Sequence, residues 1–147
     1  MMSVIDGAHG PQSRPREGLS GFPVWRSDDL PAYALAGALD EVTLGITEVV
    51  RGDDLLEETF AQVMVLKALG LQPPDWYHLP LLYGTDGRKL SKQNHAAPVA
   101  TNRNLAPYDL SRALQHLGYP LPSALTGADC ATQLSWACAT ALPGTSR

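Results

Sequence analysis

The sequence predicts an α/β fold, in which a parallel sheet with crossover helices is followed by a short helical tail. Between residues 22 and 97, stretches rich in β-branched or apolar residues alternate with helical patterns. This alternation is typical of parallel sheets. Hydrophobic residues make up 44% of the 147 residues, which is enough for a core. Beyond residue 97 the sequence favours helices.

Composition and charge argue against several classes of protein. The net charge of −4 does not suit a chain that binds nucleic acid through overall positive charge. No apolar run reaches the roughly 18 residues of a membrane span, and residues 1–20 lack the apolar segment of a secretory signal. Two cysteines, Cys130 and Cys138, make neither a disulfide framework nor a four-ligand metal site. We therefore expect a cytoplasmic protein that does not enter a membrane.

Regular structure is expected to begin only at about residue 22. Residues 1–21 are rich in glycine and proline and predict a loose lead-in. Residues 22–26 favour a short strand with a proline near its edge. A helix should follow, with Asp28 or Asp29 as its N-cap, and should end before Gly45.

Glycines and prolines divide the rest of the chain into segments with clear hydrophobic patterns. Strands are expected where β-branched or apolar residues run together, and helices where apolar residues recur three and four positions apart. In chain order we expect a strand at 46–51, a helix at 57–69, a strand at 76–83, a turn at 84–87, and helices at 107–117 and 128–141.

A basic loop follows the apolar strand expected at 76–83. Two of the three lysines of the chain, Lys89 and Lys92, flank Ser91 in this loop. Ligands of open parallel sheets bind at the carboxyl ends of the strands. Ammonium groups there neutralise polyphosphates, and a hydroxyl donates a hydrogen bond to them. On residue types alone, a solvated basic turn is an equal alternative.

The stretch Lys89-Leu90-Ser91-Lys92 resembles the KMSKS signature loop of class I aminoacyl-tRNA synthetases. The resemblance implies a Rossmann-type sheet and the ATP-dependent formation of an aminoacyl adenylate. It implies that Lys92 stabilises the phosphates of ATP, assisted by Lys89 and Ser91. ATP and Mg2+ are the cofactors that follow from it.

Tyr33 and Arg51 form a second candidate site. Tyr33 is expected in the first turn of a helix, and Arg51 at the carboxyl end of a strand. A guanidinium binds a carboxylate through paired hydrogen bonds, and a phenol hydroxyl adds a polar partner. On residue type alone, Tyr33 also fits a half-buried aromatic in a helix-packing face. Arg51 likewise fits a strand-end salt bridge to Asp53 or Asp54.

The segments around these two residues resemble the glutamyl-tRNA synthetase group. Residues 26–36 are similar to the pattern R-x-D-G-x-P-x-Y-x-L-A, and residues 45–51 to G-[IV]-T-x-V-[IV]-R. The resemblance implies that Tyr33 and Arg51 contact glutamate. Residues 78–82, His-Leu-Pro-Leu-Leu, are similar to the strand that precedes the signature loop in this group.

Within the group, residues 93–96 after Lys92 resemble the glutamyl-Q tRNA(Asp) synthetases. These enzymes activate glutamate with ATP and transfer it to queuosine, the modified base in the anticodon of tRNA(Asp). The implied partners are therefore glutamate and queuosine-containing tRNA(Asp). Two alternatives stay open: a fragment of a glutamyl-tRNA synthetase that charges tRNA(Glu), and a non-catalytic remnant or interaction module that keeps the fold.

The resemblance divides the chain into a loose lead-in (1–21), a Rossmann-type catalytic half with the KLSK loop (22–97) and a small helical tail (98–147). The His-containing ATP signature of the family's first half is not recognised before residue 22. We therefore expect the C-terminal half of a synthetase, which needs a separately supplied N-terminal half for activity. The zinc cluster of many glutamyl-Q enzymes is not recognised either. Cys130 and Cys138 are interpreted as small core residues of a helical tail.

Overall fold

The computed structural model describes residues 1–19, 21–91 and 106–141. The chain divides into two compact units, Met1–Leu81 and Leu82–Arg147. The sequence predicted boundaries after residues 21 and 97, so the main division falls earlier than expected, and the loop with Lys89 belongs to the second unit. Within the described part of the chain, no helix is long and apolar enough to cross a membrane.

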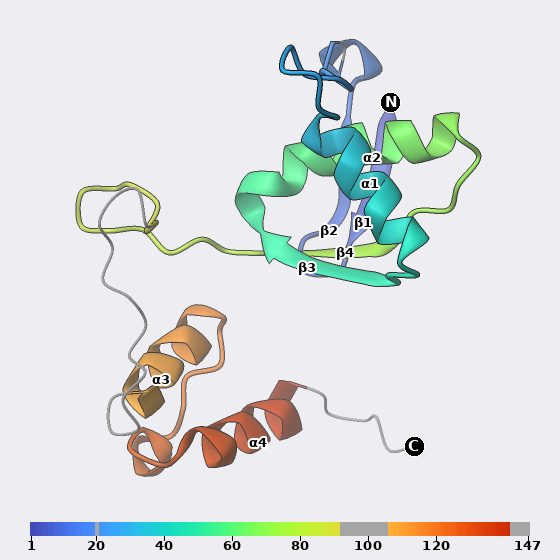
Figure 1. The fold of residues 1–147 in the computed structure, drawn as a ribbon. Coiled ribbons are helices and arrows are strands. Elements are labelled where there is room, and N and C mark those ends of the chain that lie inside the picture. Colours follow the sequence, from blue (N-terminus) through green and yellow to red (C-terminus); the bar gives the residue numbers. More distant parts are fainter. Residues whose placement is uncertain (20, 92–105, 142–147) are drawn as a thin grey trace. The chain divides into compact units, whose positions relative to one another are not determined.

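The first unit contains a four-stranded sheet in the order β2-β1-β4-β3 (Figure 1). β1 and β3 each pair with β4 in parallel, and β2 pairs with β1 in antiparallel fashion. The predicted α/β class with a parallel sheet is therefore confirmed, with one antiparallel strand added at an edge. The strands are β1 (Met2–Asp6), β2 (Gly10–Arg14), β3 (Glu48–Gly52) and β4 (Asp75–Leu79).

The hairpin of β1 and β2 corrects the expectation of a loose lead-in at residues 1–21. Met2, Val4 and Asp6 alternate with exposed residues and are buried, which is the pattern of a strand with one covered face. Gly10 has a φ of +70°, which suits the end of the connecting turn. Pro11 is accommodated because β2 is an edge strand. The many glycines and prolines therefore mark a turn and an edge, and the segment is ordered.

The segment before the first helix also differs from the prediction. In place of a strand at 22–26 there is an isolated bridge between Trp25 and Pro31 around a tight turn. In this turn the Arg26 N–H donates to the carbonyl of Leu30, at 2.8 Å, and Asp29 has a φ of +63°. The helix then begins at Tyr33 without a side-chain cap, because the expected cap residue Asp29 forms part of the turn.

Two helices cover one face of the sheet, and their ends match the sequence closely. α1 (Tyr33–Thr43) is followed by Gly45 and α2 (Leu56–Ala68) by Gly70, both with φ near +70°. A 3-10 turn, Asp53–Leu55, leads from β3 into α2. β4 ends at Leu79, earlier than the predicted residue 83, since Pro80 has no N–H for a ladder hydrogen bond.

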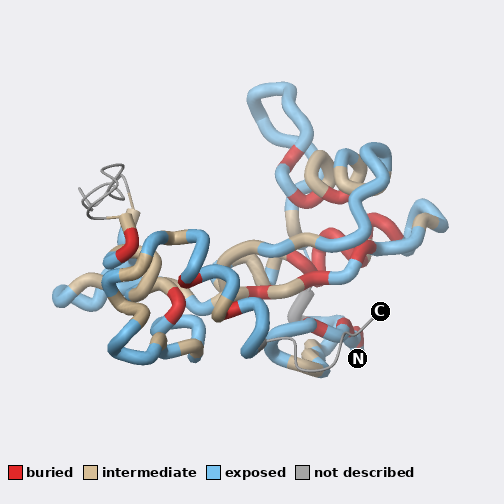
Figure 2. The backbone as a smooth tube through the Cα atoms, turned by 90° about the horizontal axis from the view of Figure 1, so that it is seen from below, coloured by how far each residue is buried: buried red, intermediate tan, exposed pale blue. Residues whose placement is uncertain are grey.

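The core lies between these helices and the sheet (Figures 1 and 2). α2 contributes half of the buried core residues and is buried on most sides, including its polar residues Thr59 and Gln62. The opposite side of β1 is open, because Ile5 is 78% exposed. The buried core residues are Met2, Val4, Ala38, Phe60, Val63, Val65, Leu66 and Trp76.

The second unit begins with the predicted turn at residues 84–87. The Gly87 N–H donates to the carbonyl of Gly84 at 3.0 Å, and Tyr83 pairs with Lys89 across the turn. The predicted helices are confirmed as α3 (Ala106–His116) and α4 (Cys130–Ala141), with a 3-10 turn, Ser123–Leu125, between them.

The helical tail is held together by a buried amide. Gln133 Nε2 donates to the carbonyls of Leu125, Thr126 and Ala128 at 3.0–3.2 Å. The cysteines lie on α4 as expected, but Cys138 is exposed and is not the core residue that its type suggested.

Candidate functional site

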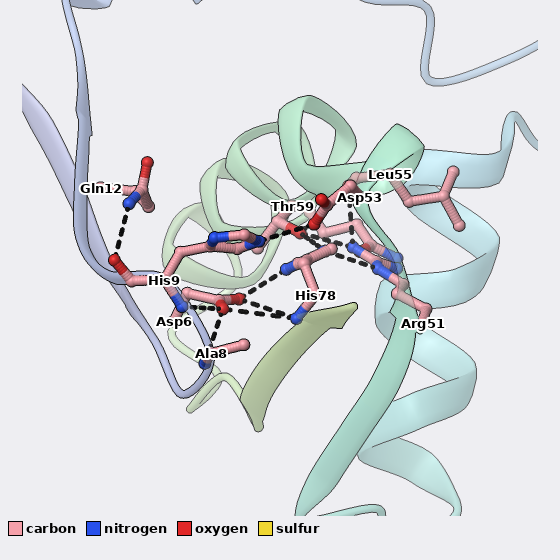
Figure 3. A network of polar contacts seen from close by, with 10 residues as sticks. Asp6, Ala8, His9, Gln12, Arg51, Asp53, Leu55, Thr59 and His78 are labelled. Atoms are coloured by element: carbon pink, nitrogen blue, oxygen red, sulfur yellow. Dashed lines mark hydrogen bonds and ion pairs between the residues drawn. The ribbon is translucent and has the colours of Figure 1, made fainter. Parts of the chain in front are cut away.

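Arg51 lies at the carboxyl end of β3, and its guanidinium is held by α2 and β4. Nη2 donates to Thr59 Oγ1 at 2.6 Å and to Gln62 Oε1 at 2.7 Å. Nε donates to His78 Nε2 at 3.1 Å (Figure 3). Only 8% of the Arg51 side chain is exposed. A buried guanidinium needs such partners, because an unpaired charge in the interior is costly.

Tyr33 approaches the remaining nitrogen of the same guanidinium. Arg51 Nη1 donates to Tyr33 Oη at 3.5 Å and lies 3.9 Å from Glu41 Oε1. These contacts are longer than those of Nε and Nη2, so Nη1 is the guanidinium nitrogen with the weakest hydrogen bonds to the protein. Tyr33 is 52% exposed, which leaves its ring and hydroxyl near solvent. The two residues that the sequence singled out together are thus adjacent, although 18 positions separate them.

Asp53 does not form the strand-end salt bridge to Arg51 that the sequence allowed as an alternative. Asp53 Oδ1 instead lies 2.6 Å from His9 Nε2, in the turn between β1 and β2. This carboxylate raises the pKa of His9, chiefly through the hydrogen bond. The pair ties the hairpin turn to the start of the 3-10 turn that leads into α2 (Figure 3).

Behind Arg51 lies a buried pair formed by Asp6 of β1 and His78 of β4. Asp6 Oδ2 is 2.6 Å from His78 Nδ1, and the side chains are 1% and 0% exposed. The N–H groups of Ala8 and His9 donate to Asp6 Oδ1 at 2.9 and 3.0 Å. Burial favours a higher pKa for Asp6, but the hydrogen bonds from His78 and from the backbone outweigh it and lower the pKa.

Glu41 and Gln62 add polar groups on the α1 and α2 side of Arg51. Burial raises the pKa of Glu41, while the charge of Arg51 opposes the shift. Glu41 Oε2 and Gln62 Nε2 are buried and have no hydrogen-bond partner among the described residues. Gly37 permits the close approach of the helices, because a Cβ at this position would lie 2.7 Å from Gln62 Nε2.

The residues of the basic loop are described only in part. Lys89 and Ser91 belong to the second unit, where Lys89 is exposed and pairs with Tyr83 across the turn. Lys92 and residues 93–96 lie outside the described residues. The assignment of Lys92, Lys89 and Ser91 to the phosphates of ATP thus stays a prediction from the sequence.

Most of the groups that surround Arg51 were not predicted from the sequence. His78 appeared only as part of an apolar strand, and Asp6 fell in the supposed lead-in. The sequence around Asp6 nevertheless contains a pattern that indicates burial. Asp6 continues the alternation of Met2 and Val4, so it occupies a position that faces the core. A carboxylate at such a position needs a buried partner, and His78 supplies it.

Comparison with known proteins identifies the family. Residues 6–125 match the family model described as tRNA synthetases class I (E and Q), catalytic domain. The chain belongs to this family. The family and the named relatives are synthetases, that is, ligases, as the signature loop suggested.

Several relatives of this chain are glutamyl-Q tRNA(Asp) synthetases. The protein from Shewanella amazonensis is 48% identical over 103 residues, which cover 70% of this chain and 35% of the relative. The protein from Vibrio cholerae is 39% identical over 140 residues, covering 94% of this chain and 45% of the relative. The chain therefore spans about 35–45% of the length of the curated relatives it matches.

Solved structures point to the same family. Glutamate-tRNA synthetase from Elizabethkingia anophelis superposes with a TM-score of 0.56 at 29% identity and covers 63% of this chain and 19% of that one. A glutamate tRNA ligase from Elizabethkingia meningosepticum, solved in complex with its amino acid, has the same TM-score and identity. The α/β fold of this chain is therefore that of a class I catalytic domain.

Proposed function

We propose that this chain carries the glutamate-binding residues, and the residues that stabilise the phosphates of ATP, of a ligase of the glutamyl-Q tRNA(Asp) synthetase type. The observation that supports this most is the approach of Tyr33 Oη to Arg51 Nη1, at 3.5 Å, in a polar site at the carboxyl end of β3. Ligands of open parallel sheets bind at this end of the strands. The relatives' names agree with the proposal.

In this proposal the side-chain carboxylate of glutamate binds between Arg51 Nη1 and Tyr33 Oη. Nη1 makes the longest contacts of the guanidinium, so it can gain a partner without giving up the short bonds of Nη2. The charge of Arg51 and the hydroxyl of Tyr33 favour glutamate over glutamine, because an amide is neutral and accepts through a single oxygen.

The reaction proposed has two steps. An oxygen of the α-carboxylate attacks the α-phosphorus of ATP, the bond to the β-phosphate breaks, and pyrophosphate leaves. Lys92, assisted by Lys89 and Ser91, stabilises the negative charge on the phosphates. A hydroxyl of queuosine in tRNA(Asp) then attacks the activated carbonyl, loses its proton, and displaces AMP. We place the reaction in the cytoplasm, where ATP and tRNA are present. Mg2+ is proposed as the counterion of ATP.

Glutamate-dependent exchange between ATP and pyrophosphate tests the proposal. The assay compares the chain alone with the chain supplied with the remaining residues of the Shewanella amazonensis relative. We expect exchange in the combined sample and little by the chain alone, since the relatives are more than twice as long. Arg51→Gln and Lys92→Ala in this chain should each lower exchange by about a hundredfold, the usual scale for losing one charge-stabilising group. Absence of exchange in every sample would favour a non-catalytic remnant.

A second candidate is the charging of tRNA(Glu), which the two solved glutamate-tRNA synthetases favour. The two candidates share glutamate and ATP and differ only in the acceptor. Transfer of labelled glutamate to queuosine-containing tRNA(Asp), to the same tRNA without queuosine, and to tRNA(Glu) separates them. The proposed function requires transfer to the first substrate alone.

A further inference from the structure

We propose that His78 and Asp6 are positioning residues, which fix the guanidinium of Arg51 so that Nη1 faces the ligand. This inference rests on the proposed function for the identity of the ligand, glutamate. Its geometric part, the fixing of Arg51, stands without the ligand. Both side chains are enclosed, at 0% and 1% exposure, and His78 contacts Arg51 directly, so we assign them a role that acts through Arg51.

The direction of the hydrogen bonds carries the argument. Arg51 Nε–H is a donor only, so at 3.1 Å it requires His78 Nε2 to accept. Thr59 Oγ1 lies 3.0 Å from the same nitrogen, and its hydroxyl can donate to a lone pair there. Nε2 of His78 therefore holds no proton, and the ring proton lies on Nδ1. There it donates to Asp6 Oδ2 at 2.6 Å. The carboxylate of Asp6 thus selects the tautomer that presents a lone pair to Arg51.

Asp6 is itself held in place and cannot turn away. It accepts the backbone N–H groups of Ala8 and His9 on Oδ1, and the N–H of His78 lies 3.2 Å from Oδ2. Asp6 and His78 are fully enclosed, on neighbouring strands β1 and β4. The chain of contacts therefore runs from a backbone turn to the guanidinium through two buried side chains.

The contacts of the guanidinium fall into two sets. Nε and Nη2 face His78, Thr59 and Gln62, all of which are buried to the full extent. Nη1 faces the half-exposed Tyr33 and lies 3.9 Å from Glu41 Oε1. Without the acceptor on His78, the guanidinium is anchored by the bonds of Nη2 alone, and its plane is no longer fixed at a second point, so Nη1 is less firmly directed toward the ligand. Preorganisation of this kind contributes to binding because the side chain is not ordered by the ligand itself.

Two substitutions of His78 separate positioning from a merely structural role. In His78→Gln the amide oxygen reaches the place of Nε2 and accepts from Arg51, while the link to Asp6 is lost. In His78→Asn the amide occupies the place of Nδ1 and keeps the link to Asp6, while Arg51 loses its acceptor. Glutamate affinity and thermal stability are measured on the full chain for both variants.

We expect His78→Asn to weaken glutamate binding by about tenfold, the scale of one hydrogen bond to a charged group, and His78→Gln to stay within about threefold of the native chain. If both variants lose affinity in proportion to their loss of stability, the positioning role is wrong. Equal affinity of His78→Asn and the native chain overturns it as well, and leaves the proposed function intact.

A spectroscopic measurement on the native chain needs neither a variant nor a ligand. Nitrogen-15 spectra of the imidazole should show the proton of His78 on Nδ1, and the Arg51 Nε–H signal should be slowed in exchange with water. The Arg51 signal should move in His78→Asn and stay in His78→Gln. A proton on Nε2 of His78 overturns the inference. If the spectra are as expected but the chain does not bind glutamate, the positioning of Arg51 is supported and the proposed function is contradicted.

Discussion

At the scale of single residues, the contacts of Arg51 join parts of the chain that are distant in sequence. Its guanidinium is shared by Tyr33 of α1, Thr59 of α2 and His78 of β4. Tyr33 and Arg51 were singled out together because each belongs to a segment that resembles the family, whereas their residue types alone left other roles open. The sequence did not predict Asp6 and His78 as a pair, since 72 positions separate them and only the sheet brings them together.

The lowered pKa of Asp6 predicts a contribution to stability at neutral pH. A carboxyl whose pKa is lower in the folded state stabilises the protein above its unfolded-state pKa of about 3.9, and this contribution is lost as the pH falls through the folded-state value. Asp6→Asn should cost about 1.5–3 kcal/mol at pH 7, as for hydrogen bonds to a charged group. Urea unfolding from pH 2 to 7 should show a smaller loss of stability toward acid in the variant. An unchanged acid dependence would contradict this role.

The pair of His9 and Asp53 predicts the opposite pH dependence. The pKa of His9 is raised, so its contribution is complete below the unfolded-state value of about 6.5 and is lost as the pH rises through the folded-state pKa. The effect should be under about 1 kcal/mol, because both side chains are a third exposed. His9→Gln keeps a hydrogen-bonding group without the charge and should remove this slope between pH 6 and 9. A slope that persists in the variant would assign it to another group.

At the scale of elements, local patterns predicted the helices and the parallel strands β3 and β4. α1 and α2 are followed by glycines, as expected, and β3 overlaps the strand expected at 46–51. The hairpin of β1 and β2 escaped prediction because glycine and proline also occur in turns and at sheet edges, so their presence does not by itself indicate a loose segment. The strand expected at 22–26 failed because Arg26 and Leu30 close a turn with their backbone groups.

The turn before α1 contains a position that favours glycine. Asp29 has a φ of +63°, and the family pattern R-x-D-G-x-P-x-Y has glycine at the same place. The carboxylate of Asp29 accepts from Trp25 Nε1 at 3.0 Å, which offsets part of the cost of this backbone conformation. The turn sets the start of α1, and with it the position of Tyr33.

Two substitutions at this position test the strain. Asp29→Ala should be about 1–2 kcal/mol less stable than Asp29→Gly, since only glycine adopts a positive φ without cost, and both variants lose the contact with Trp25. Thermal unfolding of the pair measures the difference directly. Equal stability of the two variants would show that the backbone in this turn rearranges freely.

At the scale of the whole molecule, the site around Arg51 lies entirely within the unit Met1–Leu81, and the basic loop begins the second unit. The sequence predicted both sets of residues but placed the division of the chain after residue 97. Motifs mark residues that carry chemistry, whereas the limits of a compact unit depend on long-range packing that a single sequence does not reveal. The core and its polar site form one body, in which β1, from the supposed lead-in, supplies both apolar residues and Asp6.

The most direct test of the account is a titration of the full chain with glutamate, followed by the nitrogen-15 signal of Arg51 Nε–H and the ring signals of Tyr33. We predict a saturable shift of both sets of signals with glutamate, a much weaker response to glutamine, and loss of the Tyr33 response in Arg51→Gln. Glutamate that leaves these signals unchanged, or shifts them no differently from glutamine, would contradict the claim that Arg51 and Tyr33 bind its carboxylate.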